Sequence, residues 1–483
     1  MLFPTFEFFI FFTLVLILNW GLKRWPLIWR LFLLGASYYF YSTWNSNFLL
    51  IIIIVSAFNF FSGILIRRDY FGKRKIYFIS SVIFDLIILG IFKYYDFFRL
   101  SFEELLRKAG FIASFPLLEI ILPVGLSFYI FRAISYNADV YSGKIDACKS
   151  ILDFFIYVVF FPYLLAGPIV RAGDFLSQLK EGGAKRIENF YENLSLILLG
   201  MFKKLVVSSY LALSLTDDVF AVPQNHSSLI LLLAVFAYSL VIYFDFSGYS
   251  DMAVGFAGML GFRLPVNFDL PYLSLNLRDF WRRWHMTLSY WVRDYIYIPL
   301  GGNRKGQLRK YLNLMTAMLA IGFWHGANLH FVLWGAIHGI GLGITHFLLG
   351  LKNKTKTPFI KISNSFFDKM KEKVKVFMGC FITFIFVSFA WVFFRCRTMN
   401  DALVFVKTLF SFEKIVEPLK LYVVFLVIFG IVFFLLEKKI MKALVFAQER
   451  LSLPFLILFI SCFMILTLKL GPDILPSFIY FGF

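Results

Sequence analysis

Two histidines, His285 and His325, are the residues best suited to chemistry in this sequence. His325 stands between Trp324 and Gly326, inside a run of mainly apolar residues from 312 to 350. Burial keeps an imidazole neutral, and a neutral imidazole accepts a proton from a hydroxyl group. From these residues alone, a general base and a hydrogen-bonded core histidine are equally good interpretations of His325.

His285 lies in the segment 279–306, and Arg278, Arg282 and Arg283 precede it within seven residues. A histidine among tryptophans and arginines is typical of a membrane interface, where it either orients a substrate or bonds to the backbone. In a helical segment the arginines lie on adjacent turns, and a guanidinium binds phosphate in a bidentate manner. Lipid headgroups and the ends of neighbouring helices are equally good partners for them.

The other histidines are weaker candidates. His338 follows Trp334 by one helical turn, which places it to line the same cavity as His325. We hold His330 in reserve and interpret His226 and His346 as structural or surface residues. The sequence contains neither H-E-x-x-H nor G-x-S-x-G, and we therefore predict no bound metal and no serine-hydrolase site.

Two acids at the end of an apolar run, Asp245 and Asp251, need a partner if they are buried. Pairing with one of the arginines is the expected arrangement, and a catalytic carboxylate is the alternative. Gly335, Gly339 and Gly343 repeat every four residues, which predicts a smooth helix face for close packing.

The composition is that of a helical membrane protein. Sixty per cent of the 483 residues are hydrophobic and 16% are charged, with a mean hydropathy of +0.77. The net charge of +19 comes from basic residues between the apolar runs, which the positive-inside rule and anionic lipid explain. We therefore expect a lipid bilayer and no nucleic acid as partner. The four cysteines are scattered and predict no disulfide framework.

Apolar runs predict 11 or 12 membrane spans, with further re-entrant pieces. Apolar runs at 116–136, 151–170 and 249–262 are among them. Basic residues predict that Lys73 lies in the cytoplasm and Asn45 outside. Segments 102–112 and 359–374 have amphipathic patterns that predict interfacial helices, with partner docking as the alternative.

Several motifs resemble those of the membrane-bound O-acyltransferase superfamily, and within it the alginate O-acetyltransferase group of bacteria. The similarity extends over nearly the whole chain, at residues 122–129, 166–169, 243–251, 282–289, 297–304, 323–326 and 478–481. Tyr163 departs from the pattern, because relatives often carry His or Gln there. If this position contacts the acceptor, we expect the acceptor of this chain to differ from that of its relatives.

The resemblance implies a single domain over 1–483, with N-terminal helices in 1–115, a motif-bearing core in 116–350 and C-terminal helices in 351–483. It also implies tilted helices around a central tunnel. His325 matches the family's invariant histidine and would be the base, with His285 as the second catalytic residue. Substrate or donor binding is expected of residues in and beside the motifs: Arg278, Arg282, Arg283, Trp284, Asn303, Trp324 and His338.

The function implied is O-acetylation of a cell-surface or exported polysaccharide by a multi-pass protein of the bacterial cytoplasmic membrane. The donor would be acetyl-CoA or another acyl thioester, with no bound cofactor, and an extracytoplasmic esterase-like partner would complete the transfer. D-alanyl transfer to teichoic acid is the nearest alternative. A transporter or flippase is the alternative from another class, although it would predict an internal repeat, and none is evident.

Overall fold

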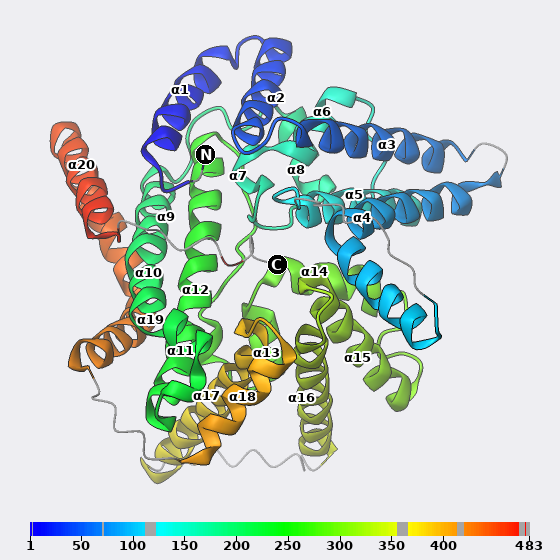
Figure 1. The fold of residues 1–483 in the computed structure, drawn as a ribbon. Helices are drawn as coiled ribbons and strands as arrows, with labels where there is room; N and C mark the ends of the chain where they lie inside the picture. The colour runs from blue at the N-terminus through cyan, green and yellow to red at the C-terminus, as the bar shows by residue number, and fades with distance from the viewer. Residues whose placement is uncertain are drawn as a thin grey trace. The chain divides into compact units, whose positions relative to one another are not determined.

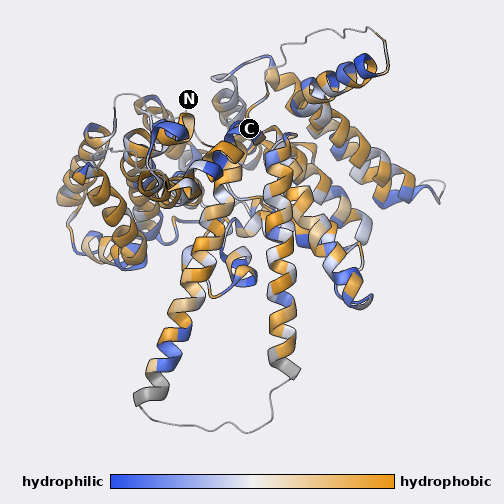
Figure 2. Cartoon of the chain, turned by 60° about the horizontal axis from the view of Figure 1, so that its bottom comes forward, coloured by the Kyte–Doolittle hydropathy of each residue, from blue (hydrophilic) through white to orange (hydrophobic). Residues whose placement is uncertain are grey.

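The computed structural model describes all residues except 2, 70–71, 112–121, 355–365, 413–419, 473–478 and 480–483. Every regular element within them is a helix, which confirms the all-α class. Hydrophobic residues predominate along the long helices (Figure 2). Among the described residues, eight helices are long and apolar enough to cross a membrane: Phe48–Arg68, Arg74–Lys108, Phe190–Ala221, Ser228–Met259, Leu329–Leu351, Met370–Arg395, Leu421–Gln448 and Leu453–Leu470.

Some predicted segments have different boundaries in the structure. The apolar run expected at 249–262 is not a separate element, because its residues through Met259 continue α12 (Ser228–Met259). The run 151–170 breaks into α6 (Ile151–Val159) and α7 (Phe161–Leu164), with Pro162 at the start of the second helix. A proline lacks the N–H that would continue the first helix. The run 151–170 is therefore two short helices rather than one span.

The predicted interfacial helix at 102–112 is not separate. Its residues through Lys108 are the last turns of α4 (Arg74–Lys108), which bends partway along its length (Figure 1). Near its end, Arg99 pairs with Asp96 and Glu103 on the neighbouring turns. Residues 359–365 of the second predicted interfacial segment lie outside the described residues, as do 116–121 of one run and Phe478, Tyr480 and Phe481. From Phe366 onward, the second segment forms the start of α17 (Phe366–Arg395).

The chain divides into two compact units, each assembled from three stretches of sequence. Unit 1 contains Met1–Phe202, Gly248–Pro265 and Met441–Ile465. Its buried centre is rich in phenylalanine, where the rings of Phe8, Phe40, Phe161 and Phe256 pack within 6.4 Å of one another's centroids in four pairs. Its own helices, besides α4, α6 and α7, are α1 (Phe6–Leu22), α2 (Pro26–Ser42), α3 (Phe48–Arg68), α5 (Leu126–Ser142), α8 (Ala172–Lys180) and α9 (Phe190–Phe202).

Unit 2 contains Lys203–Ser247, Val266–Ile440 and Leu466–Phe483, and it holds both predicted catalytic histidines. It begins with the π-helix η2 (Lys203–Ser208), followed by α10 (Ser209–Leu211), the π-helix η3 (Ala212–Thr216), α11 (Asp217–Ala221) and η4 (Pro223–Asn225). Next come η5 (Pro271–Leu273), α13 (Leu277–Arg283), α14 (Met286–Val292), the π-helix η6 (Arg293–Tyr297), α15 (Gly306–His325), α16 (Leu329–Lys354), α17 and α18 (Met399–Ser411). The helices α19 (Leu421–Gln448) and α20 (Leu453–Leu470) begin in one unit and end in the other.

Helices α15 and α16 form an antiparallel hairpin, and His325 is the last residue of α15, beside the turn between the two helices. A Cβ atom at Gly335 would lie 2.5 Å from the carbonyl oxygen of Met318 on α15, and one at Gly322 would lie 2.4 Å from that of Phe331. Real Cβ atoms do not approach so closely, and only glycine permits this helix contact. The predicted close packing is confirmed for Gly335 and for Gly339, whose Cβ atom would lie 2.7 Å from Sδ of Met315, but not for Gly343, whose nearest neighbour would be 3.8 Å away.

Candidate functional site

His325 is the last residue of α15 and is buried, with 3% of its surface exposed. Aromatic rings surround it. Its ring centroid lies 4.6 Å from that of Trp324, 4.8 Å from Phe394 and 5.3 Å from Trp334, and the last two rings meet it edge-on. The predicted burial of this imidazole is confirmed, and the end of α15 fixes its place.

His285 is the N-cap residue of α14 and adopts a left-handed backbone conformation, with φ of 39°. This conformation is unusual for a residue with a side chain, and it separates α13 from α14. The side chain is buried, with 1% of its surface exposed. Burial lowers the pKa of His285 to about 3, and the ring is therefore neutral at physiological pH.

Asn267 determines which nitrogen of His285 carries the proton. Its Oδ1 accepts a hydrogen bond from the backbone N–H of Thr287 at 3.3 Å and from the Thr287 hydroxyl at 2.9 Å. Because a backbone N–H can only donate, the atom facing it must be the amide oxygen. The same oxygen lies 3.0 Å from Nδ1 of His285, so Nδ1 is protonated and Nε2 carries the lone pair.

The indole of Trp324 connects the two histidines. Its ring centroid lies 6.5 Å from that of His285 and 4.6 Å from that of His325. Phe246, from one of the sequence motifs, meets the His285 ring edge-on at 4.7 Å. The structure therefore brings both predicted catalytic residues against one predicted binding residue.

His338 extends this cluster on α16. It has no exposed surface, and its ring lies 4.7 Å from that of Trp334 and 5.3 Å from that of Trp281. Trp334 therefore touches both His325 and His338. Within the part of the chain that the structure describes, neither nitrogen of His338 has a hydrogen-bond partner. Its predicted part in substrate binding stays a prediction.

The arginines lie at the other end of the hairpin from His325. Arg278 and Arg282 occupy the exposed face of α13, and together with Lys310 they interact electrostatically with His346. Fifteen residues separate Lys310 from His325 on α15, which corresponds to about 22 Å along a helix. These basic residues therefore form a surface distant from the His325 ring.

The remaining predicted binding residues differ in exposure. Arg283 pairs with Asp279, with 3.1 Å between Nε and Oδ1. Trp284 is buried against Trp391, at 5.0 Å between ring centroids. Asn303 is exposed, in the turn that precedes α15. Their contact with a substrate stays a prediction.

The expected pairing of Asp245 with an arginine is wrong. Asp245 pairs with Lys204 from the π-helix η2, and it also accepts a hydrogen bond from the backbone N–H of Ile479 at 2.9 Å. The adjacent Lys203 pairs with Glu437, which accepts a hydrogen bond from the Tyr243 hydroxyl at 2.7 Å. The buried acid beside Phe246 thus has a structural partner.

The fold and the histidine cluster define a multi-pass membrane protein with two buried histidines, His285 and His325. The sequence matches the model of the membrane-bound O-acyltransferase family over residues 36–389. The chain belongs to this family and is an O-acyltransferase. The central tunnel implied by the resemblance stays a prediction.

Proteins named for three different transfers are similar to this chain. A probable alginate O-acetylase of Pseudomonas aeruginosa is 39% identical over 386 residues, which cover 79% of this chain and 70% of the relative. The peptidoglycan O-acetyltransferase of Helicobacter pylori is 34% identical over 407 residues, with 78% and 73% covered. The teichoic acid D-alanyltransferase of Streptococcus thermophilus is 28% identical over 295 residues, with 58% and 69% covered.

Proposed function

We propose that the chain transfers acetyl groups from an acyl thioester, acetyl-CoA, to hydroxyl groups of a cell-surface or exported polysaccharide. The main support for the proposal is that two buried histidines, His285 and His325, both lie against the indole ring of Trp324. The relatives named for O-acetyl transfer match this chain at 34–39% identity over 78–79% of its length. The D-alanyltransferase match is weaker and shorter, which favours acetyl over D-alanyl as the transferred group.

In the proposed reaction His325 acts as the general base. It takes the proton from the acceptor hydroxyl, whose oxygen attacks the thioester carbonyl carbon. A C–O bond forms, the C–S bond breaks, and the proton passes from His325 to the leaving sulfur. No net proton is released. His285, with its proton fixed on Nδ1 by Asn267, presents the Nε2 lone pair to a hydroxyl and orients it.

The donor would use the basic surface of Arg278, Arg282 and Lys310. Coenzyme A carries phosphates, and a guanidinium binds them in a bidentate manner. The separation of about 22 Å along α15 requires a long arm between the phosphates and the thioester, which coenzyme A has. No metal or other bound cofactor takes part in this proposal.

The proposed location is the cytoplasmic membrane of a bacterium. The donor would be used from the cytoplasmic side and the acceptor reached on the other. An extracytoplasmic esterase-like partner is proposed to accept the acetyl group and pass it to the polymer. The immediate acceptor is then a hydroxyl group of that partner.

The test measures acetate released by mild base from the surface polymer of cells in which the variant replaces the natural chain. His325→Ala is expected to lower ester content by a factor of about 10²–10⁴, the usual effect of losing a general base. His226→Gln, which changes a histidine outside the cluster, is the control and should have no effect. Normal expression of His325→Ala with near wild-type acetylation would contradict the proposal, and release of D-alanine instead of acetate would favour the D-alanyl alternative.

A further inference from the structure

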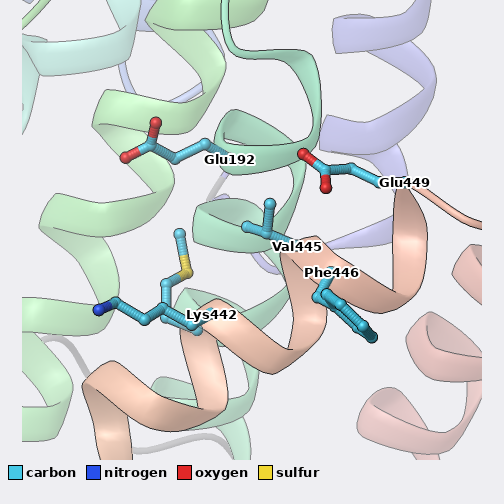
Figure 3. A pocket seen from close by; sticks show the side chains of 6 residues that line it. Glu192, Lys442, Val445, Phe446 and Glu449 are labelled. Carbon is cyan, nitrogen blue, oxygen red and sulfur yellow. The ribbon is translucent and has the colours of Figure 1, made fainter.

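A cavity of about 300 Å³ opens on unit 1, between the first turn of α9 and the end of α19 (Figure 3). Its size is at the lower end for small-molecule sites. Figure 3 shows the carboxylates of Glu192 and Glu449 on one side of the cavity and the Lys442 side chain on the other. Three less polar side chains complete the lining: Met441, Val445 and Phe446.

The charges of this cavity are not neutralised by the protein. Within the described parts of the chain, Glu192, Lys442 and Glu449 form no side-chain hydrogen bond or ion pair with another residue. All three side chains are exposed. Two carboxylates and one ammonium group therefore face the same small space, and each is available to a ligand that carries both signs of charge.

The sequence of α19 places the cavity at the level of the lipid headgroups. The helix is apolar from Leu421 to Leu436, and its charged residues begin directly afterwards, at Glu437, Lys438, Lys439 and Lys442. Such a change marks where a membrane helix leaves the hydrocarbon. A phospholipid fits a cavity at this depth, because its headgroup can meet the charged side chains and its acyl chains the apolar lining.

We propose that the cavity binds the headgroup of a zwitterionic phospholipid with a primary ammonium group, of the ethanolamine type. The ammonium group donates hydrogen bonds to Glu192 and Glu449, and Lys442 binds the phosphate. Glycerol-type headgroups carry only negative charge, which the two carboxylates repel.

Choline headgroups lack the groups that this cavity recognises. A quaternary ammonium has no N–H to donate and is bound through the faces of aromatic rings. The cavity has one aromatic ring, that of Phe446. The Arg450 guanidinium carbon already lies 3.3 Å from its centroid. The carboxylates therefore select a primary ammonium over a methylated one.

The experiment titrates the purified, delipidated full chain with dioleoyl phosphatidylethanolamine, phosphatidylcholine and phosphatidylglycerol, and measures each bound lipid by native mass spectrometry. The ethanolamine lipid is expected to bind about tenfold more tightly than the other two, since each of two partly exposed ion pairs contributes a factor of about two to five. The double variant Glu192→Gln/Glu449→Gln should lose this preference. Lys442→Gln should weaken all three lipids alike.

Lys439→Gln is the matched control, because this lysine is exposed on the same helix and does not line the cavity; it should bind like the wild type. All four substitutions replace exposed side chains, so folding is preserved. Equal binding of the choline and ethanolamine lipids, tighter binding of the glycerol lipid, or an ethanolamine preference that survives the double substitution would each overturn the proposal.

Discussion

Replacing Asn267 tests the orientation of His285 directly. Asn267→Ala removes the acceptor of three hydrogen bonds, from Nδ1 of His285 and from the backbone N–H and hydroxyl of Thr287. All three residues are buried, and a buried donor without an acceptor costs about 1–3 kcal/mol. The three donors share one oxygen and the hydroxyl can rotate, so we expect a total loss of about 2–4 kcal/mol in the free energy of unfolding.

The same change should lower activity, because nothing then fixes the proton of His285 on Nδ1. We expect at least about a tenfold loss of acetyl ester, as for positioning groups that act on a catalytic histidine. Asn267→Asp keeps an acceptor at this position. A carboxylate beside the ring favours the imidazolium form, so this variant raises the pKa of His285 above its wild-type value of about 3. Its activity should therefore acquire a new dependence on pH.

Denaturant unfolding in detergent measures the stability of each variant, and base-released acetate measures its activity at several pH values. Asn225→Ala is the control, because this asparagine is exposed in the same unit. If Asn267→Ala unfolds and acetylates like Asn225→Ala, the assignment of the His285 tautomer is refuted.

Three further predictions follow from other parts of the molecule. Burial lowers the pKa of His285 from 6.5 to about 3, so the unfolded chain binds a proton below pH 6.5 that the folded chain does not. This histidine should contribute about 2 kcal/mol to the loss of stability between pH 7.5 and pH 5. His285→Gln should reduce that loss by about this amount, and an unchanged pH slope would contradict the prediction. Gly335→Ala should lower the free energy of unfolding by about 1–3 kcal/mol, because its Cβ atom would meet a backbone oxygen at 2.5 Å. Gly343→Ala is the control and should be neutral in the same unfolding assay, because its nearest neighbour would be 3.8 Å away. Equal stability of the two variants would show that α15 and α16 move apart at little cost. A cysteine at Asn45 should react with an impermeant thiol reagent from outside the cell and one at Lys73 should not, and the reverse result would invert the orientation.

The position of His325 was predictable because its signals are local. Glycines flank the Trp324–His325 pair, and a four-residue glycine period follows it, which together indicate a broken backbone and a tight hairpin. The burial and the partner helix in the structure agree with both signals. What the sequence could not indicate is that Trp324 touches His285 as well, because that contact depends on the left-handed turn at His285.

Asn267 and Lys204 were missed for a different reason. Asn267 is an isolated amide in an irregular segment, and only the folding of that segment against Thr287 gives it a role. Lys204 reaches Asp245 from a π-helix, whose extra residue per turn changes which side chains face inward. Hydropathy patterns assume regular helices, and they therefore miss side-chain contacts made from a π-helix. They also do not show when two predicted segments belong to one helix, as residues 102–108 belong to α4.

The division of the chain has a consequence for its synthesis. Domains usually fold as they emerge, from the N-terminus onward. Unit 1 requires Met441–Ile465 and unit 2 requires Leu466–Phe483, so neither is complete until the ribosome has passed residue 440. A premature stop within α19 would therefore leave two unfinished units rather than one intact and one missing, and quality-control proteases would meet both at once.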